Sequence, residues 1–290
     1  MIKQMKKERD YLLDSSLISA TFSQIENTKK LYNMKVVYCN DYIQLYTFNN
    51  DKFYKNKDID DKKALNILNV DTDNLKTNNY SNSSDIKGIE IKNIMRSKLQ
   101  CQRLAKCNSN IWETFITLTF QKNVININVG NKEFKNFVRK VRRIYNDFKY
   151  LCVPEFQKRG AIHYHLLTNI SIKNDKLIYK QIDNKKFLHI KYWNNGFTKV
   201  DNIKNDIKKI IGYISKYMTK DIDDRLFGKH RYFYSQNLNK PQISYLNLSN
   251  KKHCEFLINI LNNKTLIYNN KYIDNFYNDE ILFEEYFKCQ

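Results

Sequence analysis

The stretch YLCVPEFQKRGAIHYHLL, residues 150–167, decides the fold of this chain. It consists of two apolar runs joined by a short polar turn, which is the pattern of a β-hairpin. We place the turn at residues 158–160 (KRG), where Gly160 takes the positive φ of a three-residue loop. In this register Glu155 lies directly opposite His163.

One face of the second strand of this hairpin carries two imidazoles. Side chains alternate along a strand, so His163 and His165 share a face and Tyr164 points to the other. Together with Glu155 they offer nitrogen and oxygen donors that suit a divalent cation, and the hairpin is therefore predicted to be a metal site. Two alternatives stay open. A histidine on an apolar strand is commonly a core residue, and a one-residue slip would turn Glu155 away.

The neighbouring segments predict an α+β fold. Residues 112–120 (WETFITLTF) have the composition of a strand, with Thr117 and Thr119 on one side. Apolar residues at helical spacing follow over 132–148. The order strand, helix, strand, strand predicts a split βαβ unit, in which helices pack on a central antiparallel sheet.

A second predicted helix, residues 201–219, carries paired tyrosines and lysines. Tyr213 and Tyr217 are four residues apart, so their phenols lie one turn apart on one side. Lys216 and Lys220 each follow a tyrosine by three residues. In a chain with 21 tyrosines, such a pair is also explained by ordinary packing.

Three segments in this order resemble the HUH endonuclease superfamily. They are FITLTF at 115–120, EFQKRGAIHYHLL at 155–167 and YISKYMTKD at 213–221. The resemblance is strongest to the rolling-circle replication initiator (Rep) proteins of small plasmids and single-stranded DNA phages. It covers roughly residues 95–245 and implies an RRM-like or ferredoxin-like nuclease core.

The resemblance also implies a reaction, the metal-dependent nicking and joining of single-stranded DNA at an origin. Tyr213 or Tyr217 would be the nucleophile, leaving a 5′-phosphotyrosine and a free 3′-OH, and both stay as candidates. Lys216 and Lys220 would steady the phosphate. Related alternatives are a transposase or a relaxase, and a different one is a non-enzymatic protein that binds single-stranded nucleic acid.

The resemblance further implies cofactors and partners. Glu155, His163 and His165 would hold Mn²⁺ or Mg²⁺. The partners would be the single-stranded origin, a host helicase and a polymerase. As DNA-binding residues we expect Lys158, Arg159 and Arg231.

Composition limits the choice of partner and compartment. The formal net charge of +20 predicts a polyanionic partner, nucleic acid rather than a membrane, although AT-rich coding also enriches lysine. No GxxxxGK motif occurs, so no P-loop is expected. Six cysteines without a CxxC pair, together with the lack of a signal peptide or long apolar run, predict a soluble cytoplasmic protein.

The pattern along the chain suggests three parts. Residues 1–85 form an N-terminal extension of unknown role, ending in a polar linker at 72–85. Residues 86–248 form the endonuclease core, and residues 249–290 form a C-terminal appendage. Hairpins are expected to turn at Asn40-Asp41 and around Asn269-Asn270.

Overall fold

The computed structural model describes residues 31–53, 83–157, 160–182, 186–204, 211–212, 214, 224–226, 228–274 and 279–288. The chain divides into two units, residues 79–239 and residues 1–78 with 240–290. Each unit contains an antiparallel sheet with helical segments, which confirms the predicted α+β class. None of the described helices combines the length and apolar character needed to cross a membrane.

The unit of residues 79–239 contains a seven-stranded sheet in the order β6-β7-β8-β3-β5-β4-β9. Its strands are β3 (Thr114–Thr119), β4 (Tyr150–Phe156), β5 (Ile162–Thr168), β6 (Ile178–Ile182), β7 (Lys186–Ile190), β8 (Thr198–Asn202) and β9 (Phe233–Tyr234). Helix α5 (Ile127–Ile144) connects β3 to β4, and β5 pairs antiparallel with both. A strand inserted between two strands that a helix connects is a split βαβ arrangement.

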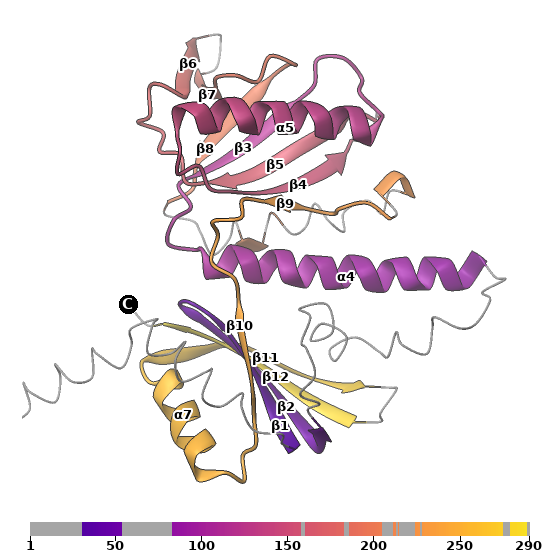
Figure 1. Ribbon diagram of the computed structural model, residues 1–290, viewed down its shortest axis with the longest axis vertical. Helices are drawn as coiled ribbons and strands as arrows, with labels where there is room; N and C mark the ends of the chain where they lie inside the picture. The colour runs from indigo at the N-terminus through magenta and orange to yellow at the C-terminus, as the bar shows by residue number, and fades with distance from the viewer. Residues whose placement is uncertain are drawn as a thin grey trace, which may run out of the picture. The chain divides into compact units, whose positions relative to one another are not determined.

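Helix α5 lies across one face of this sheet (Figure 1). It begins at Asn126, whose side chain accepts hydrogen bonds from the first turn as an N-cap does. The predicted bounds of 132–148 were therefore wrong at both ends, because the cap was overlooked and Phe148 reaches the core from beyond the helix. The buried residues of its apolar stripe are Phe134, Phe137, Val138 and Val141.

The two faces of the sheet bury separate clusters. On the α5 side, alternate residues of β3 and β5 pack against the helix, among them Ile116, Leu118, Tyr164 and Leu166. The opposite side packs against helix α4 (Ser83–Cys107) and contains Cys101, Leu104, Phe115, Leu151, Leu167, Ile211 and Ile214. The histidine side of the sheet is thus covered by α4 and by the segment around residue 211.

The β4–β5 hairpin has the predicted turn and register. The Gln157 N–H donates to the Ala161 carbonyl at 2.9 Å, and the Gly160 N–H donates to the Gln157 carbonyl at 2.7 Å. Gly160 has φ 88°, a conformation that glycine adopts without steric cost. Glu155 pairs with His163, as expected from the sequence.

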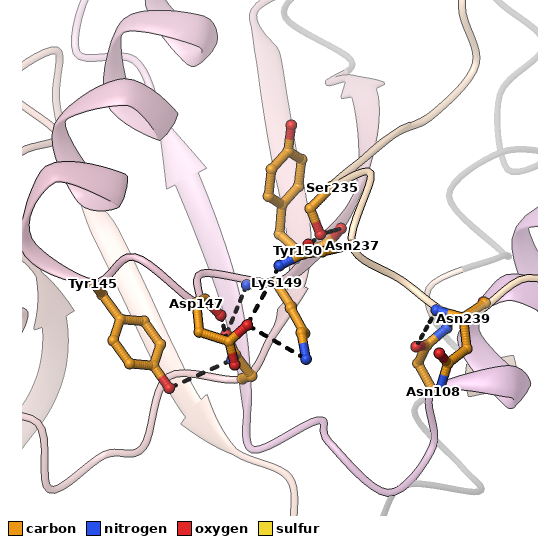
Figure 2. Close-up of polar contacts among 9 residues, drawn as sticks. Asn108, Tyr145, Asp147, Lys149, Tyr150, Ser235, Asn237 and Asn239 are labelled. Atoms are coloured by element: carbon orange, nitrogen blue, oxygen red, sulfur yellow. Dashed lines mark hydrogen bonds and ion pairs between the residues drawn. The ribbon is translucent and has the colours of Figure 1, made fainter.

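The segment after β9 is attached to the sheet and to the end of α4 (Figure 2). Ser235 exchanges hydrogen bonds with the Tyr150 backbone, accepting from its N–H at 3.1 Å. Asn108 and Asn239 form a reciprocal pair, with two hydrogen bonds of 2.9 Å each. These contacts fix the path of residues 235–239 within this unit, which also contains the short 3-10 helix η2 (Asp224–Leu226).

The other unit contains a five-stranded sheet in the order β10-β1-β2-β12-β11. Its elements are β1 (Leu31–Cys39), β2 (Tyr42–Phe53), β10 (Gln242–Leu246), α7 (Lys251–Leu261), β11 (Lys264–Asp274) and β12 (Asp279–Lys288). The turn at Asn40-Asp41 is confirmed. The turn predicted around Asn269-Asn270 was wrong, because both residues pair with β12 in the middle of β11.

This sheet combines the two ends of the described chain. Strand β2 pairs with β1 on one side and with β12 on the other. The sequence analysis treated residues 1–85 and 249–290 as separate segments, since strand pairing over such a separation leaves no local pattern. Residues 79–239 are therefore inserted between β2 and β10 of one sheet-forming unit.

Gly196 and Gly212 are predicted to respond in opposite ways to alanine. A Cβ at Gly196 would collide with backbone atoms of Thr119 and Gln121, which cannot move without disturbing β3. Gly196→Ala should lower the free energy of unfolding by more than about 2 kcal/mol, measured by urea denaturation. Gly212 is helical and a Cβ there meets nothing, so Gly212→Ala should leave stability unchanged or raise it by up to about 1 kcal/mol.

Candidate functional site

Two rows of side chains cross the sheet on the face opposite α5. In the first row, Glu155 of β4 pairs with His163 of β5, which pairs with Thr119 of β3. In the second row, His165 of β5 pairs with Thr117 of β3. The predicted metal-ligating residues therefore lie on one face within two neighbouring strands.

His165 is hydrogen-bonded through both nitrogens of its ring. Its Nε2 lies 2.8 Å from Oε2 of Glu155, and its Nδ1 lies 3.3 Å from the hydroxyl of Thr117. The ring also stacks against Phe115 at 5.9 Å between centroids. Partners on both edges and one face hold the imidazole in a single orientation.

The second imidazole lies beside the first, with 6.2 Å between the ring centroids of His163 and His165. The three candidate ligands are nearly buried, with exposed fractions of 7% for Glu155, 7% for His163 and 5% for His165. Among the described residues, no three His, Cys, Asp or Glu side chains are already arranged as a metal centre. The donor set of two imidazoles and one carboxylate nevertheless fits a divalent cation in its chemistry.

Thr117 is a residue whose role the sequence analysis missed. Its hydroxyl can either donate to Nδ1 of His165 or accept from it. It therefore accommodates the tautomer that donates to Glu155 through Nε2 and also the tautomer that leaves Nε2 free to bind a metal. Alternation in FITLTF placed Thr117 on one face, but its contact with His165 depends on the pairing of β3 with β5.

The segment with the candidate tyrosines is only partly described. Ile211, Gly212 and Ile214 are helical, and Ile211 and Ile214 pack in the cluster on the histidine side of the sheet. The Asn202 side chain accepts a hydrogen bond from the Lys204 N–H at 3.2 Å, as the predicted N-cap would. The four candidate catalytic residues lie outside the described residues, namely Tyr213, Lys216, Tyr217 and Lys220.

Tyr164, the residue between the two histidines, has the properties of a structural tyrosine. Its ring is fully buried on the α5 side and stacks on Phe134 at 4.8 Å. Its hydroxyl donates to Oδ1 of Asn131 at 2.8 Å. Burial raises the pKa of this phenol, so it is a poorer nucleophile than an exposed tyrosine.

The three predicted DNA-binding residues differ in how the structure presents them. Lys158 and Arg159 lie outside the described residues, and Arg231 is buried, with only 9% of it exposed. An arginine that the sequence analysis overlooked lies beside the hairpin turn. Arg225 donates to the Gly160 carbonyl at 3.1 Å, and its guanidinium lies 3.7 Å from the ring centroid of Phe156.

The comparison with protein families found one match, and it includes the candidate site. Residues 113–222 match the family model of the replication-associated protein ORF2. This range starts just before β3, contains the β4–β5 hairpin and extends through the tyrosine segment. The match supports a role in the initiation of DNA replication and an interaction with DNA, consistent with a protein like the rolling-circle initiators. Comparisons with curated proteins and with solved structures found no match.

Buried tyrosines around this sheet predict a loss of stability at alkaline pH. Burial raises the pKa of Tyr150 to about 12, and it also raises the pKa of Tyr164 and of Tyr232. The unfolded phenols titrate near pH 10, so their stabilising contribution is complete below pH 10 and is lost as the pH rises above it. The free energy of unfolding should fall by about 1.4 kcal/mol per pH unit for each such group just above pH 10.

Urea denaturation between pH 8 and 11.5 measures this slope. The double variant Tyr150→Phe, Tyr164→Phe should show a shallower decline than the unmodified protein. Equal slopes for the two proteins would contradict the assignment.

Proposed function

We propose that this chain nicks and rejoins single-stranded DNA at a replication origin, with Tyr213 or Tyr217 as nucleophile and Glu155, His163 and His165 as metal ligands. The observation that carries the proposal is the shared face of the sheet. The two imidazoles and the carboxylate lie on the face against which Ile211 and Ile214 pack. The match of residues 113–222 to a replication-associated family supports it.

The covalent step conserves the energy of the phosphodiester bond. The phenol oxygen of the tyrosine forms a bond to the phosphorus, and the bond from phosphorus to the 3′ oxygen breaks. The phenol proton is lost and the departing 3′ oxygen is protonated, which gives a 5′-phosphotyrosine and a free 3′-OH. The reverse reaction rejoins the strand without ATP. The free 3′-OH would then prime synthesis by a host polymerase, after a host helicase separates the strands.

A phenol with a pKa near 10 is a weak nucleophile at neutral pH, so the phosphate needs activation. When bound, Mn²⁺ or Mg²⁺ would polarise the phosphate as a Lewis acid. Glu155 would supply the negative charge of the ligand set, and Thr117 would orient His165 through Nδ1. Lys216 and Lys220, which follow the tyrosines by one turn, would steady the negative charge of the phosphate.

Replacing both candidate tyrosines should abolish covalent attachment to DNA. The test incubates the protein with Mn²⁺ and labelled single-stranded oligonucleotides that tile the replicon origin, and detects adducts by denaturing electrophoresis. The double variant Tyr213→Phe, Tyr217→Phe should form no adduct, because no phenol remains to attack the phosphorus. The single variants show which tyrosine acts first.

Tyr164→Phe is the matched control, since it removes a phenol from the opposite face of the sheet. This variant should form adducts at the normal rate and lose about 1 kcal/mol of stability with the hydrogen bond to Asn131. An adduct of undiminished yield in the double tyrosine variant would overturn the proposed mechanism.

The metal site is tested separately by calorimetric titration with Mn²⁺ in the absence of DNA. His163→Ala and His165→Ala should remove measurable binding, because each deletes a ligand. Thr117→Val should weaken binding roughly 10- to 100-fold, whereas Thr117→Ser retains the hydroxyl and should bind as the unmodified protein does. His230→Ala removes an exposed imidazole away from the hairpin and should have no effect. Binding that persists in His165→Ala would refute the ligand set.

A further inference from the structure

Four aromatic rings form a cluster on the strands that extend the sheet beyond β3. Tyr179 of β6 stacks on His189 of β7 with 5.4 Å between ring centroids. Phe197, the residue before β8, meets His189 edge-on at 5.0 Å and Phe187 at 6.3 Å. The proposed nicking chemistry uses none of these residues.

The cluster lies on the same face of the sheet as the candidate metal ligands. The Thr119 N–H donates to the Phe197 carbonyl at 2.8 Å, and Thr119 pairs on its other side with His163. Phe197 therefore extends the row formed by Glu155, His163 and Thr119, with only a threonine between the ring and the imidazole. At the spacing of neighbouring strands, Phe197 is about 10 Å from β5.

Two of the four rings are open to solvent, although they are held in place. Phe197 is 49% exposed and Tyr179 is 43% exposed, whereas His189 between them is buried. His189 is fixed by the hydroxyl of Thr198, which lies 3.3 Å from its Nδ1. Gly196 allows the chain to pass so close to the end of β3 that Phe197 has one defined position. Large apolar surface displayed on a rigid support indicates a binding surface.

The charges around the cluster favour a nucleic acid as the partner. Lys199 follows Phe197 on the same face, is exposed, and pairs with Asp201 at 2.8 Å. Exposed aromatic rings next to basic side chains on a sheet are the combination that binds unpaired bases, because rings stack on bases of any sequence while cations contact phosphates. The chain as a whole carries a net charge of +20.

We propose that Phe197, together with Tyr179, is a stacking platform for unpaired bases of the DNA strand that lies across the candidate site. A base on Phe197 would place the adjoining backbone over Thr119, next to His163. The proposal rests on the proposed function for the identity of the strand. It adds a site that fixes the register of the strand relative to the cleaved phosphate.

The experiment measures the anisotropy of a fluorescein-labelled oligodeoxythymidine of about 15 nucleotides, a length within the site size of such grooves, without metal, so that no cleavage contributes. Phe197→Ala should weaken binding roughly 5- to 100-fold, and Tyr179→Ala should weaken it in the same direction. Phe197→Trp should bind at least as well as the unmodified protein, whereas Phe197→Leu, which keeps apolar area without a π-face, should be weakened like Phe197→Ala. Tyr268→Ala removes an equally exposed tyrosine from the five-stranded sheet and should have no effect.

The dependence of affinity on salt separates stacking from charge. Phe197→Ala should keep the slope of log K against log salt, while Lys199→Gln should reduce its magnitude by about 0.7, as expected for one phosphate contact on a single strand. Each variant is compared at its own thermal stability, and Phe197→Leu provides the test if Phe197→Ala does not fold. Normal affinity in Phe197→Leu or in folded Phe197→Ala would overturn the platform.

The outcome distinguishes this inference from the proposed function. Weakened binding of Phe197→Ala in a protein that forms no tyrosine adduct would support the platform and refute nicking. Normal binding of Phe197→Ala in a protein that does form the adduct would refute the platform alone.

Discussion

The register of the β4–β5 hairpin is the constraint on which the rest of the structure depends. Side chains alternate between the two faces of a strand, so a slip of one residue would exchange His163 and His165 with Tyr164. The turn at Gly160 prevents this slip, because its two backbone hydrogen bonds and its positive φ fit a three-residue loop. The apolar residues of β5 then face α5, and the imidazoles face the other side.

This division gives the two faces of the sheet different chemistry. The α5 face is apolar, and the phenol of Tyr164 on that face has a raised pKa and a hydrogen-bonded hydroxyl. The opposite face combines an apolar region under α4 with a polar row that ends in exposed aromatic rings. His165 links the two regions, since it stacks on Phe115 while its nitrogens contact Glu155 and Thr117.

The parts of this arrangement that depend on local pattern could be predicted from the sequence. Alternation and a single glycine were enough to place Glu155 opposite His163. Contacts between strands distant in sequence left no such signal, and Thr117 and Phe197 were missed for that reason. Local signals also misled, because Asn269-Asn270 has the composition of a turn and yet lies within β11, where pairing with β12 outweighs local preference. The tyrosine pair was found by its spacing and its resemblance, and its role stays a prediction.

The insertion of residues 79–239 within the other unit has a consequence for biosynthesis. The hairpin of β1 and β2 leaves the ribosome first, but its neighbours β10 and β12 are translated about two hundred residues later. The inserted unit has all its strands available before then, so we expect it to fold while the early hairpin still waits with unpaired edges. Closure of the five-stranded sheet would then be the last step of folding, and a nascent chain that stalls before β12 would be prone to aggregation.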